Sequence, residues 1–443
     1  MIKMEKKRFP WGKTFLLGFG FLGISIIWPI FNQYIPLFLQ AGNPDFERQL
    51  LAEGRELPKI VGFGLAPSLA MFIMTWDNLL NMFIAPWAGS VSDRTWNKLG
   101  RRKMWILLGA PVALLAFVFV PVAQTVLAIL VFILITNIGM ALFRSPTVAW
   151  LGDLFERDDR SKANGVINLM GGVGGLLAYF GSGIIFNAFE SSSPTLARMM
   201  PFVAGAVVTA VALVTALIFV KEPRTLPGGE DREKANVLHN VRVLFSNPDK
   251  SGVLVLVSIL FWFMAFNALE TGLSSFAVFS LGMRPGTASI YAGLVTISFI
   301  IFSIPAGFLG TRFGRGPIIR VGLIGLVFLL LFGYFFVNGS LLFATVLVIT
   351  GGFWALVNVN SLPLVYDHGD ERRIGAFTGL YYFSSQLAAV LGPTLGGFLV
   401  QALGSEYRWL WLFSFVFMTL ALLTMLAVKR GKAQPAIQEA LPG

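Results

Sequence analysis

The sequence contains no cysteine and only two histidines among its 443 residues. The absence of cysteine excludes disulfide bonds, thiolate metal sites and a cysteine nucleophile. The two histidines, His239 and His368, stand in polar stretches between apolar segments, so a histidine metal site is not expected. Charged residues are also scarce, at 13% against roughly 25% in ordinary globular proteins. A soluble protein of this length would lack the polar surface that it needs.

Apolar residues take the place of the missing polar ones. They make up 56% of the chain, together with 47 glycines, and the mean hydropathy is +0.73. Helical stretches of about 20 apolar residues, enough to cross a hydrocarbon core of about 30 Å, recur along the whole chain. We therefore predict an all-α integral membrane protein with twelve transmembrane helices in two pseudo-symmetric six-helix bundles. The predicted spans are residues 14–39, 62–91, 104–122, 126–151, 163–188, 200–220, 252–281, 287–310, 317–337, 341–365, 375–402 and 407–428.

The net charge of +11 is distributed unevenly between the two sides of this predicted membrane protein. The side that holds both termini carries 27 of the lysines and arginines, the opposite side carries 6, and Arg144 lies within a span. Because cytoplasmic loops are rich in Lys and Arg, we predict cytoplasmic termini in a plasma (inner) membrane. No small-residue cleavage pattern follows the first span, which favours a retained helix over a signal peptide. The excess of lysine and arginine is thus explained by the membrane topology, and nucleic acid is not expected as a partner.

The longest polar stretch follows the sixth predicted span and divides the chain into two halves. We predict an N-terminal bundle over residues 1–220, a cytoplasmic linker over 221–251, and a C-terminal bundle with a cytoplasmic tail over 252–443. Apolar residues at helical spacing within the linker predict an amphipathic helix on the membrane surface, with a disordered linker as the alternative. These residues are Val237, Leu238, Val241, Leu244 and Phe245.

The strongest motif, GSVSDRTWNKLGRRK, lies after the second predicted span. Its Asp93 can pair with a cation or interact with a helix N-terminus, and so hold the cytoplasmic side closed. The plain alternative is a basic loop that only sets topology. A shorter version with Thr311 in place of Asp93 follows the eighth span, and this repetition favours a gate. The predicted gate residues are Gly89, Asp93, Arg94, Arg101, Arg102, Asp153 and Arg312.

The segment SDRTWNKLGRR within this motif resembles the signature of the major facilitator superfamily, in the form found in glycoside:cation symporters and sucrose-carrier-like proteins. Residues 143–175 and 375–397 also resemble the sucrose-carrier-like branch. This resemblance implies a secondary transporter and no enzyme activity, with spans 1, 4, 7 and 10 lining a central cavity between the halves. Asn81 and Ala85 stand where the melibiose-carrier type has two aspartates for sodium, and the first span lacks the histidine of plant sucrose carriers. Proton coupling through other residues is therefore expected.

Three charged residues lie well inside the predicted spans: Asp77 on the second, Arg144 on the fourth and Glu270 on the seventh. Ionised groups at such depth are costly, so they are usually paired, solvated or functional. Because burial favours the neutral form of a carboxyl group, Asp77 and Glu270 are the candidates for proton coupling. Arg144 stays charged and is a candidate for binding sugar hydroxyls or holding a carboxylate. The alternatives are structural hydrogen bonds for the two acids and a static ion pair for Arg144.

Polar and aromatic side chains form stripes on several of the predicted spans. Amides offer donors and acceptors to sugar hydroxyls, and aromatic rings stack on the apolar face of a pyranose. Interhelical hydrogen bonds are the simpler alternative for any one of these residues. The predicted substrate-binding residues are Trp28, Asn32, Gln33, Asn137, Arg144, Asn267, Thr271, Trp354, Asn358, Tyr382 and Gln386.

These patterns predict a monomeric, proton-coupled transporter of a sugar or glycoside, without a bound cofactor or metal. Its expected partners are the small-molecule substrate, protons and the lipid bilayer. Two other functions fit the sequence. One is an exporter or carrier of lipophilic, drug-like or lipid substrates, because 42 phenylalanines can line an apolar cavity. The other is a membrane sensor of the same fold that does not transport.

Overall fold

The computed structural model describes residues 9–155, 157–222, 250–367 and 374–428. Within them, twelve helical segments are long and apolar enough to cross a membrane, which confirms the predicted all-helical fold with twelve spans. The segment predicted as an amphipathic helix and both histidines lie outside the described residues. The first six spans are formed by α1 (Trp11–Gln40), α3 (Pro67–Ile73), α4 (Trp76–Arg94), α5 (Lys103–Phe119), α6 (Val126–Leu154), α7 (Arg157–Leu176), α8 (Ser182–Glu190) and α9 (Pro194–Phe219). The last six are formed by α11 (Ser251–Ser275), α12 (Pro285–Phe313), α13 (Arg315–Phe336), α14 (Ser340–Asp367), α15 (Ile374–Ala402) and α16 (Trp409–Leu426).

The helices are organised in two compact units. As far as the structure describes them, the first unit contains residues 9–66, 73–155, 157–222 and 277–293. The second contains residues 67–72, 250–276, 294–367 and 374–428. Each unit is therefore mostly one half of the chain, together with a short segment contributed by the other half.

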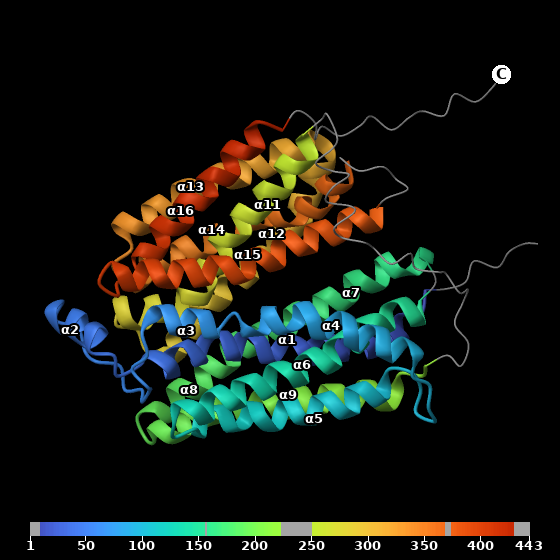
Figure 1. The fold of residues 1–443 in the computed structure, drawn as a ribbon, viewed down its shortest axis with the longest axis horizontal. Helices are drawn as coiled ribbons and strands as arrows, with labels where there is room; N and C mark the ends of the chain where they lie inside the picture. The colour runs from blue at the N-terminus through green and yellow to red at the C-terminus, as the bar shows by residue number, and fades with distance from the viewer. Residues whose placement is uncertain (1–8, 156, 223–249, 368–373, 429–443) are drawn as a thin grey trace, which may run out of the picture. The chain divides into compact units, whose positions relative to one another are not determined.

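Glycines set the packing inside the first unit, where α5 lies beside α6 (Figure 1). A Cβ atom on Gly109 would lie 2.9 Å from the Gly139 carbonyl oxygen, and one on Gly139 would lie 2.6 Å from the Ala113 backbone nitrogen. Small residues allow the backbones of membrane helices to approach closely in this way. The same unit packs α1 against α7 and α9.

Replacing Gly139 with alanine is expected to lower the free energy of unfolding by about 1–3 kcal/mol, because the added methyl group overpacks a tight contact. Gly165 on α7 is the matched control, since a Cβ atom there meets nothing within 4 Å. Alanine at that position is expected to stabilise the helix by about 0.5–1 kcal/mol. Thermal unfolding in detergent measures both variants, and equal melting temperatures would contradict the close contact of α5 with α6.

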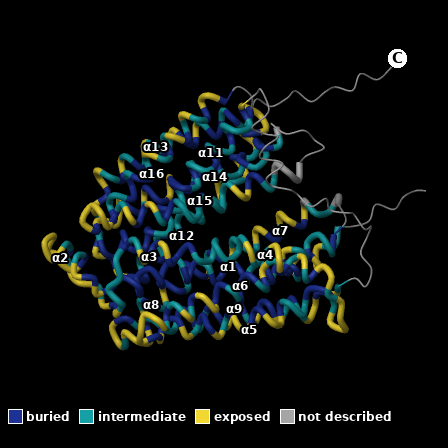
Figure 2. The backbone as a smooth tube through the Cα atoms, viewed as in Figure 1, coloured by how far each residue is buried: buried dark blue, intermediate teal, exposed yellow. Residues whose placement is uncertain are grey.

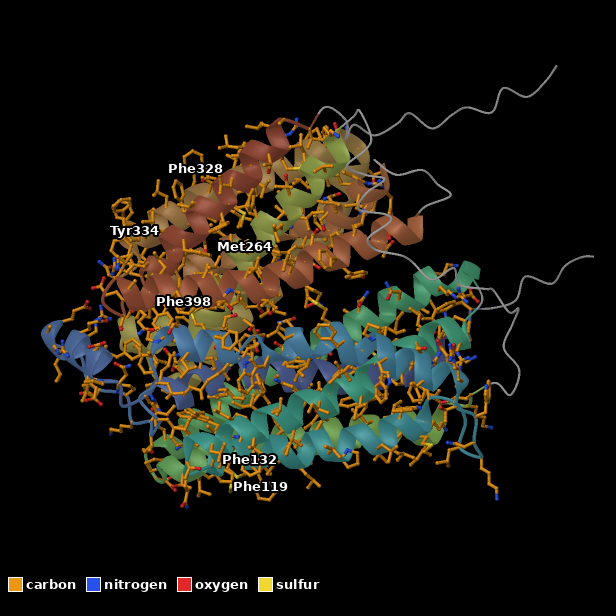
Figure 3. The ribbon with its side chains drawn as sticks, in the orientation of Figure 1. Phe119, Phe132, Met264, Phe328, Tyr334 and Phe398 are labelled. Atoms are coloured by element: carbon orange, nitrogen blue, oxygen red, sulfur yellow. The ribbon has the colours of Figure 1, made fainter. Side chains whose placement is uncertain are left out.

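Exposed residues follow the outward faces of several helices (Figure 2). Large apolar side chains are exposed on several helices, for example Leu108 and Leu115 on α5. Phe328 on α13 is another (Figure 3). At one end of α5, Phe119 stacks on Phe132 of α6, with ring centroids 5.7 Å apart. Apolar rows on helices of spanning length are the surfaces expected to contact lipid.

The second span departs from the single helix predicted over residues 62–91. Its helix begins only at Pro67, a residue suited to the first position of a helix, and a turn at Met74 and Thr75 separates α3 from α4. Neither glycine nor proline marks this turn, so the sequence carries no signal for it. The turn places Asp77 in the first turn of α4, where the helix dipole favours a negative charge.

Three further local features were not predicted. Helix α2 (Pro44–Ala52) lies in the loop after the first span, and its N-cap Asn43 side chain accepts a 2.9 Å hydrogen bond from the Asp45 backbone N–H. Phe46 and Leu50 are its buried apolar residues. Single π-helical turns occur at η2 (Leu177–Gly181) in the fifth span and at η3 (Phe276–Ser280) in the seventh. Such turns insert one extra residue into the helical repeat and are hard to read from hydropathy.

Candidate functional site

A cluster of four charged residues joins three helices of the first unit, and we call it the α4–α6 charge cluster. It consists of Asp93 near the end of α4, Arg101 and Arg102 just before α5, and Asp153 near the end of α6. Arg102 contacts Asp93 at 2.5 Å and Asp153 at 2.8 Å. Arg101 contacts Asp153 at 2.6 Å and Asp93 at 3.5 Å. Each arginine therefore bridges both carboxylates.

Burial differs sharply within this cluster. The side chain of Arg102 is 3% exposed and that of Asp153 is 13% exposed, whereas Asp93 is 44% exposed. A buried charge is stable only when it is paired and hydrogen-bonded. The Arg102–Asp153 pair is therefore the energetic centre of the cluster, and the more exposed Asp93 contributes less because water screens it.

Glu222, which the sequence analysis missed, completes this region. Its carboxylate accepts hydrogen bonds from the backbone N–H groups of Arg101, Arg102 and Lys103, at 3.1 Å for Arg102 and 2.9 Å for Lys103. It also accepts a 2.8 Å hydrogen bond from the Trp150 indole. A carboxylate at a helix N-terminus satisfies N–H groups that have no intrahelical partner. The only feature of the sequence that could have drawn attention to Glu222 is its position after the sixth span, directly before a proline.

Of the three other predicted gate residues, all within the described part of the chain, Gly89 alone contacts this cluster, because its carbonyl oxygen accepts a 3.5 Å hydrogen bond from the Arg102 guanidinium. Arg94, at the end of α4, is exposed and takes no part in it. Gly89 lies where α4 passes α6, since a Cβ atom there would be 3.0 Å from the Ser145 hydroxyl oxygen. Arg312, in the second unit, lies over the ring of Phe313 with its guanidinium carbon 5.3 Å from the ring centroid. The predicted set is therefore not one assembly.

Asp77 and Arg144, two of the three charges inside the spans, belong to the first unit and interact electrostatically. They form no direct ion pair. Asp77 is half-buried, and its Oδ1 accepts a 2.8 Å hydrogen bond from the Asn78 side-chain amide. Arg144 is exposed although it lies well inside α6. An exposed arginine at this depth faces water more favourably than lipid.

Several predicted substrate-binding residues of the first unit have polar atoms without partners among the described residues. Asn137 is 1% exposed, and both polar atoms of its amide are unpaired. The Gln33 side-chain oxygen and the Trp28 indole N–H are unpaired as well, and Asn32 is half-buried. Buried polar groups are nearly always hydrogen-bonded, so each exception requires an explanation such as a bound water or ligand. The Asn81 side-chain oxygen, on the same helix as Asp77, is a fifth such atom.

The second unit holds the remaining predicted residues, and the structure gives them mixed surroundings. Glu270 and Thr271 on α11 are half-buried, and Asn267 donates a 2.7 Å hydrogen bond to the Phe263 carbonyl. Trp354 stacks on Phe266 with ring centroids 3.9 Å apart, which covers one face of the indole. Asn358 and Gln386 are half-buried, with the Gln386 side-chain oxygen unpaired among the described residues, and Tyr382 is exposed.

Comparisons with known proteins agree with this architecture. The family model of the Major Facilitator Superfamily matches residues 14–393 and, in an overlapping second match, residues 275–442. None of the curated proteins matches the sequence. Solved structures do match, among them a mutant of the nucleoside transporter NupG, with a TM-score of 0.70, 14% identity and coverage of 94% of this chain and 100% of that one.

Two further structures extend the likeness. The D-xylose-proton symporter matches with a TM-score of 0.64 and 15% identity, over 96% of this chain and 98% of that one. The fucose:proton symporter FucP of E. coli matches with a TM-score of 0.56 and 16% identity, over 96% and 100% of the two chains. At these identities the likeness shows the fold alone. The family match, however, spans most of the sequence, and the chain therefore belongs to the Major Facilitator Superfamily and is a multi-pass membrane transporter.

Proposed function

We propose that this transporter takes up a sugar or glycoside together with protons, by alternating access. The observation that carries the proposal is that Asp77 and Arg144, an acid and a base inside the spans, lie in one unit that also holds buried amides without partners among the described residues. The resemblance of the loop after the second span to sucrose-carrier-like proteins supports the substrate class. Two similar structures belong to proton symporters of fucose and D-xylose. We further propose a monomer in the plasma (inner) membrane with both termini in the cytoplasm.

Asp77 is the proposed proton-binding group. When its carboxylate is ionised, its negative charge partly offsets the positive charge of Arg144. When it is protonated, this offset is lost and the full charge of the guanidinium acts on the substrate. Because this offset exists in only one protonation state, binding of the proton changes the affinity for the substrate. Binding of the substrate changes the affinity for the proton by the same factor. Glu270 on α11 is a second candidate for the same role in the other unit.

The amides of the first unit are the proposed binding groups for sugar hydroxyls. A buried amide that stays unpaired costs about 1–3 kcal/mol, so Gln33 and Asn137 gain from a ligand that pairs them. A hydroxyl donates to an amide oxygen and accepts from an amide N–H, which matches both atoms left unpaired on Asn137. Trp28 lies on the same helix as Gln33 and adds an aromatic surface for a pyranose face.

The α4–α6 charge cluster is the proposed cytoplasmic gate. It ties the end of α4 to the start of α5 and the end of α6 through ion pairs of 2.5–2.8 Å. Movement of α4 at this end therefore requires these pairs to break. Rearrangement of salt bridges accompanies some transitions between two stable states of a protein.

Purified protein in proteoliposomes tests the proposal. With an inside-alkaline gradient of about two pH units, a transported sugar is expected to accumulate up to about 100-fold, because one proton supplies about 1.36 kcal/mol per pH unit. Counterflow with a panel of monosaccharides, disaccharides and glycosides identifies the substrate without any gradient. Protein-free liposomes and a protonophore are the controls. Accumulation that ignores the pH gradient would contradict proton coupling, and counterflow with no sugar would contradict the substrate class.

A further inference from the structure

We infer that the transported sugar carries one carboxylate group, and that the Arg144 guanidinium binds it while Asp77 holds the coupled proton. The inference rests on the proposed function and narrows the substrate class of the same site. Three features carry it: the free donors of Arg144, the charge balance inside the spans of the first unit, and the unpaired amide of Asn137.

Arg144 directs none of its hydrogen-bond donors to the described part of the protein. It forms no hydrogen bond or ion pair there, and its side chain is exposed. An arginine that braced the bundle would place its donors on a carbonyl or carboxylate oxygen. The static ion pair considered as an alternative is therefore absent from this structure's described residues. What remains is a planar group of donors that matches the two oxygens of a carboxylate.

Asp77 does not occupy these donors. Its Oδ1 is bound by the Asn78 amide at 2.8 Å, and its link to Arg144 is electrostatic without direct contact. Once Asp77 takes up the coupled proton, Arg144 is left as an uncompensated positive charge. One carboxylate restores neutrality, whereas a neutral sugar leaves a net positive charge and a doubly charged phosphate leaves a net negative one. Arg144 is exposed in this structure, but a net charge becomes costly once alternating access encloses the substrate and removes this water.

Other charged residues of this unit cannot supply the balance. On α6 and on three helices that pack against it, α1, α4 and α5, the remaining charges all stand at helix ends. They are Lys13, Asp93, Arg94, Lys103 and Asp153. At about 1.5 Å per residue, Asp153 lies about 13.5 Å along α6 from Arg144. Arg198 on α9 lies near that helix's first turn, over the ring of Phe38.

Asn137 supplies the recognition of hydroxyls beside the charge. It lies seven residues before Arg144 on α6, which is two turns along the same face and about 10.5 Å along the axis. Long side chains on a helix lean toward its N-terminus, and Asn137 lies on the N-terminal side of Arg144. Both polar atoms of the Asn137 amide are buried and unpaired. A sugar ring with one carboxylate presents groups for both residues.

The test compares each neutral sugar with its own carboxylate derivative, such as D-glucose with D-glucuronate and D-galactose with D-galacturonate. Binding to the full-length protein in detergent is measured by tryptophan fluorescence, at a pH where the acid is ionised. At least one carboxylate is expected to bind about tenfold more tightly than its neutral counterpart, as a charge-assisted contact predicts. If sugars bind but no sugar carboxylate binds more tightly than its neutral counterpart, the inference is overturned and the proposed function stands. If none of these sugars or sugar carboxylates binds, both the inference and the proposed function are overturned.

Three variants assign the preference to Arg144. Arg144→Gln is expected to abolish it, and Arg144→Lys to keep part of it, because lysine retains the charge without the planar donors. Arg198→Gln is the matched control, since it removes an arginine from the same unit and is expected to leave the preference unchanged. A carboxylate preference that survives Arg144→Gln overturns the inference.

The charge moved by the wild-type protein gives a measurement that needs no variant. A proton and a monocarboxylate together carry no net charge, so carboxylate uptake in proteoliposomes is expected to ignore an imposed membrane potential. A proton with a neutral sugar moves one charge, and accumulation then changes tenfold for about every 59 mV. Carboxylate uptake that follows the potential in this way overturns the inference, even if Arg144→Gln fails to fold.

Discussion

Replacing Asp77 with asparagine is expected to remove proton-driven accumulation while leaving exchange of substrate across the membrane. Wild-type protein is expected to accumulate substrate up to about 100-fold under a gradient of about two pH units, with one proton per substrate. In Asp77→Asn the ratio is expected to fall to about one, because an amide cannot bind and release the proton. Asparagine keeps the shape of the side chain and an oxygen that accepts the Asn78 hydrogen bond, so counterflow is expected to persist.

Two variants make this result specific. Glu47→Gln removes an exposed acid on α2 and is expected to leave accumulation unchanged. Glu270→Gln tests the second candidate, since loss of coupling there with coupling retained in Asp77→Asn would transfer the role to Glu270. Loss of counterflow in Asp77→Asn would instead indicate that Asp77 binds substrate or supports the fold.

Replacing Arg102 with glutamine is expected to destabilise the protein by about 3–5 kcal/mol, the usual cost of breaking a buried ion pair by removing one partner. The Arg102 side chain is 3% exposed and contacts Asp93 and Asp153. Its removal leaves the largely buried Asp153 carboxylate with Arg101 alone. Thermal unfolding in detergent, followed by tryptophan fluorescence, measures the loss.

Graded variants of the same cluster separate charge pairing from a general effect of mutation. Arg94→Gln, at an exposed position outside the cluster, is expected to change stability by no more than about 0.5 kcal/mol. Asp153→Asn is expected to cost more than Asp93→Asn, because Asp153 is 13% exposed and Asp93 is 44% exposed. Equal effects of Arg102→Gln and Arg94→Gln would show that the cluster does not stabilise the protein.

The twelve spans could be predicted because hydropathy alone decides them. A helix that crosses lipid satisfies its own backbone hydrogen bonds, so a long apolar run has no other stable form there. The break before Asp77 has no such signal, since Met74 and Thr75 are neither glycine nor proline. Helix α2 was missed for a related reason. It is short, and only Phe46 and Leu50 give it a buried face.

Within the candidate site, too, some charged residues could be predicted from the sequence and others could not. Asp93, Arg101 and Arg102 are close in the sequence and contact one another in the structure, whereas Arg94 in the same motif is exposed. Glu222 was missed because about 120 residues separate it from its partners, and because those partners are mainly backbone N–H groups. A backbone N–H is common to almost every residue and leaves no trace in a sequence pattern.

By itself, the sequence determined the class of molecule, its twelve spans and the small number of charges that enter the membrane. These follow from the cost of placing polar groups in lipid, which acts on each segment independently of its neighbours. Only the tertiary structure decided which groups meet. It showed Asp77 near Arg144 without direct contact, Arg144 with free donors, and Asn137 buried without a partner. Such relations depend on how helices distant in the chain pack, and no local pattern encodes that packing.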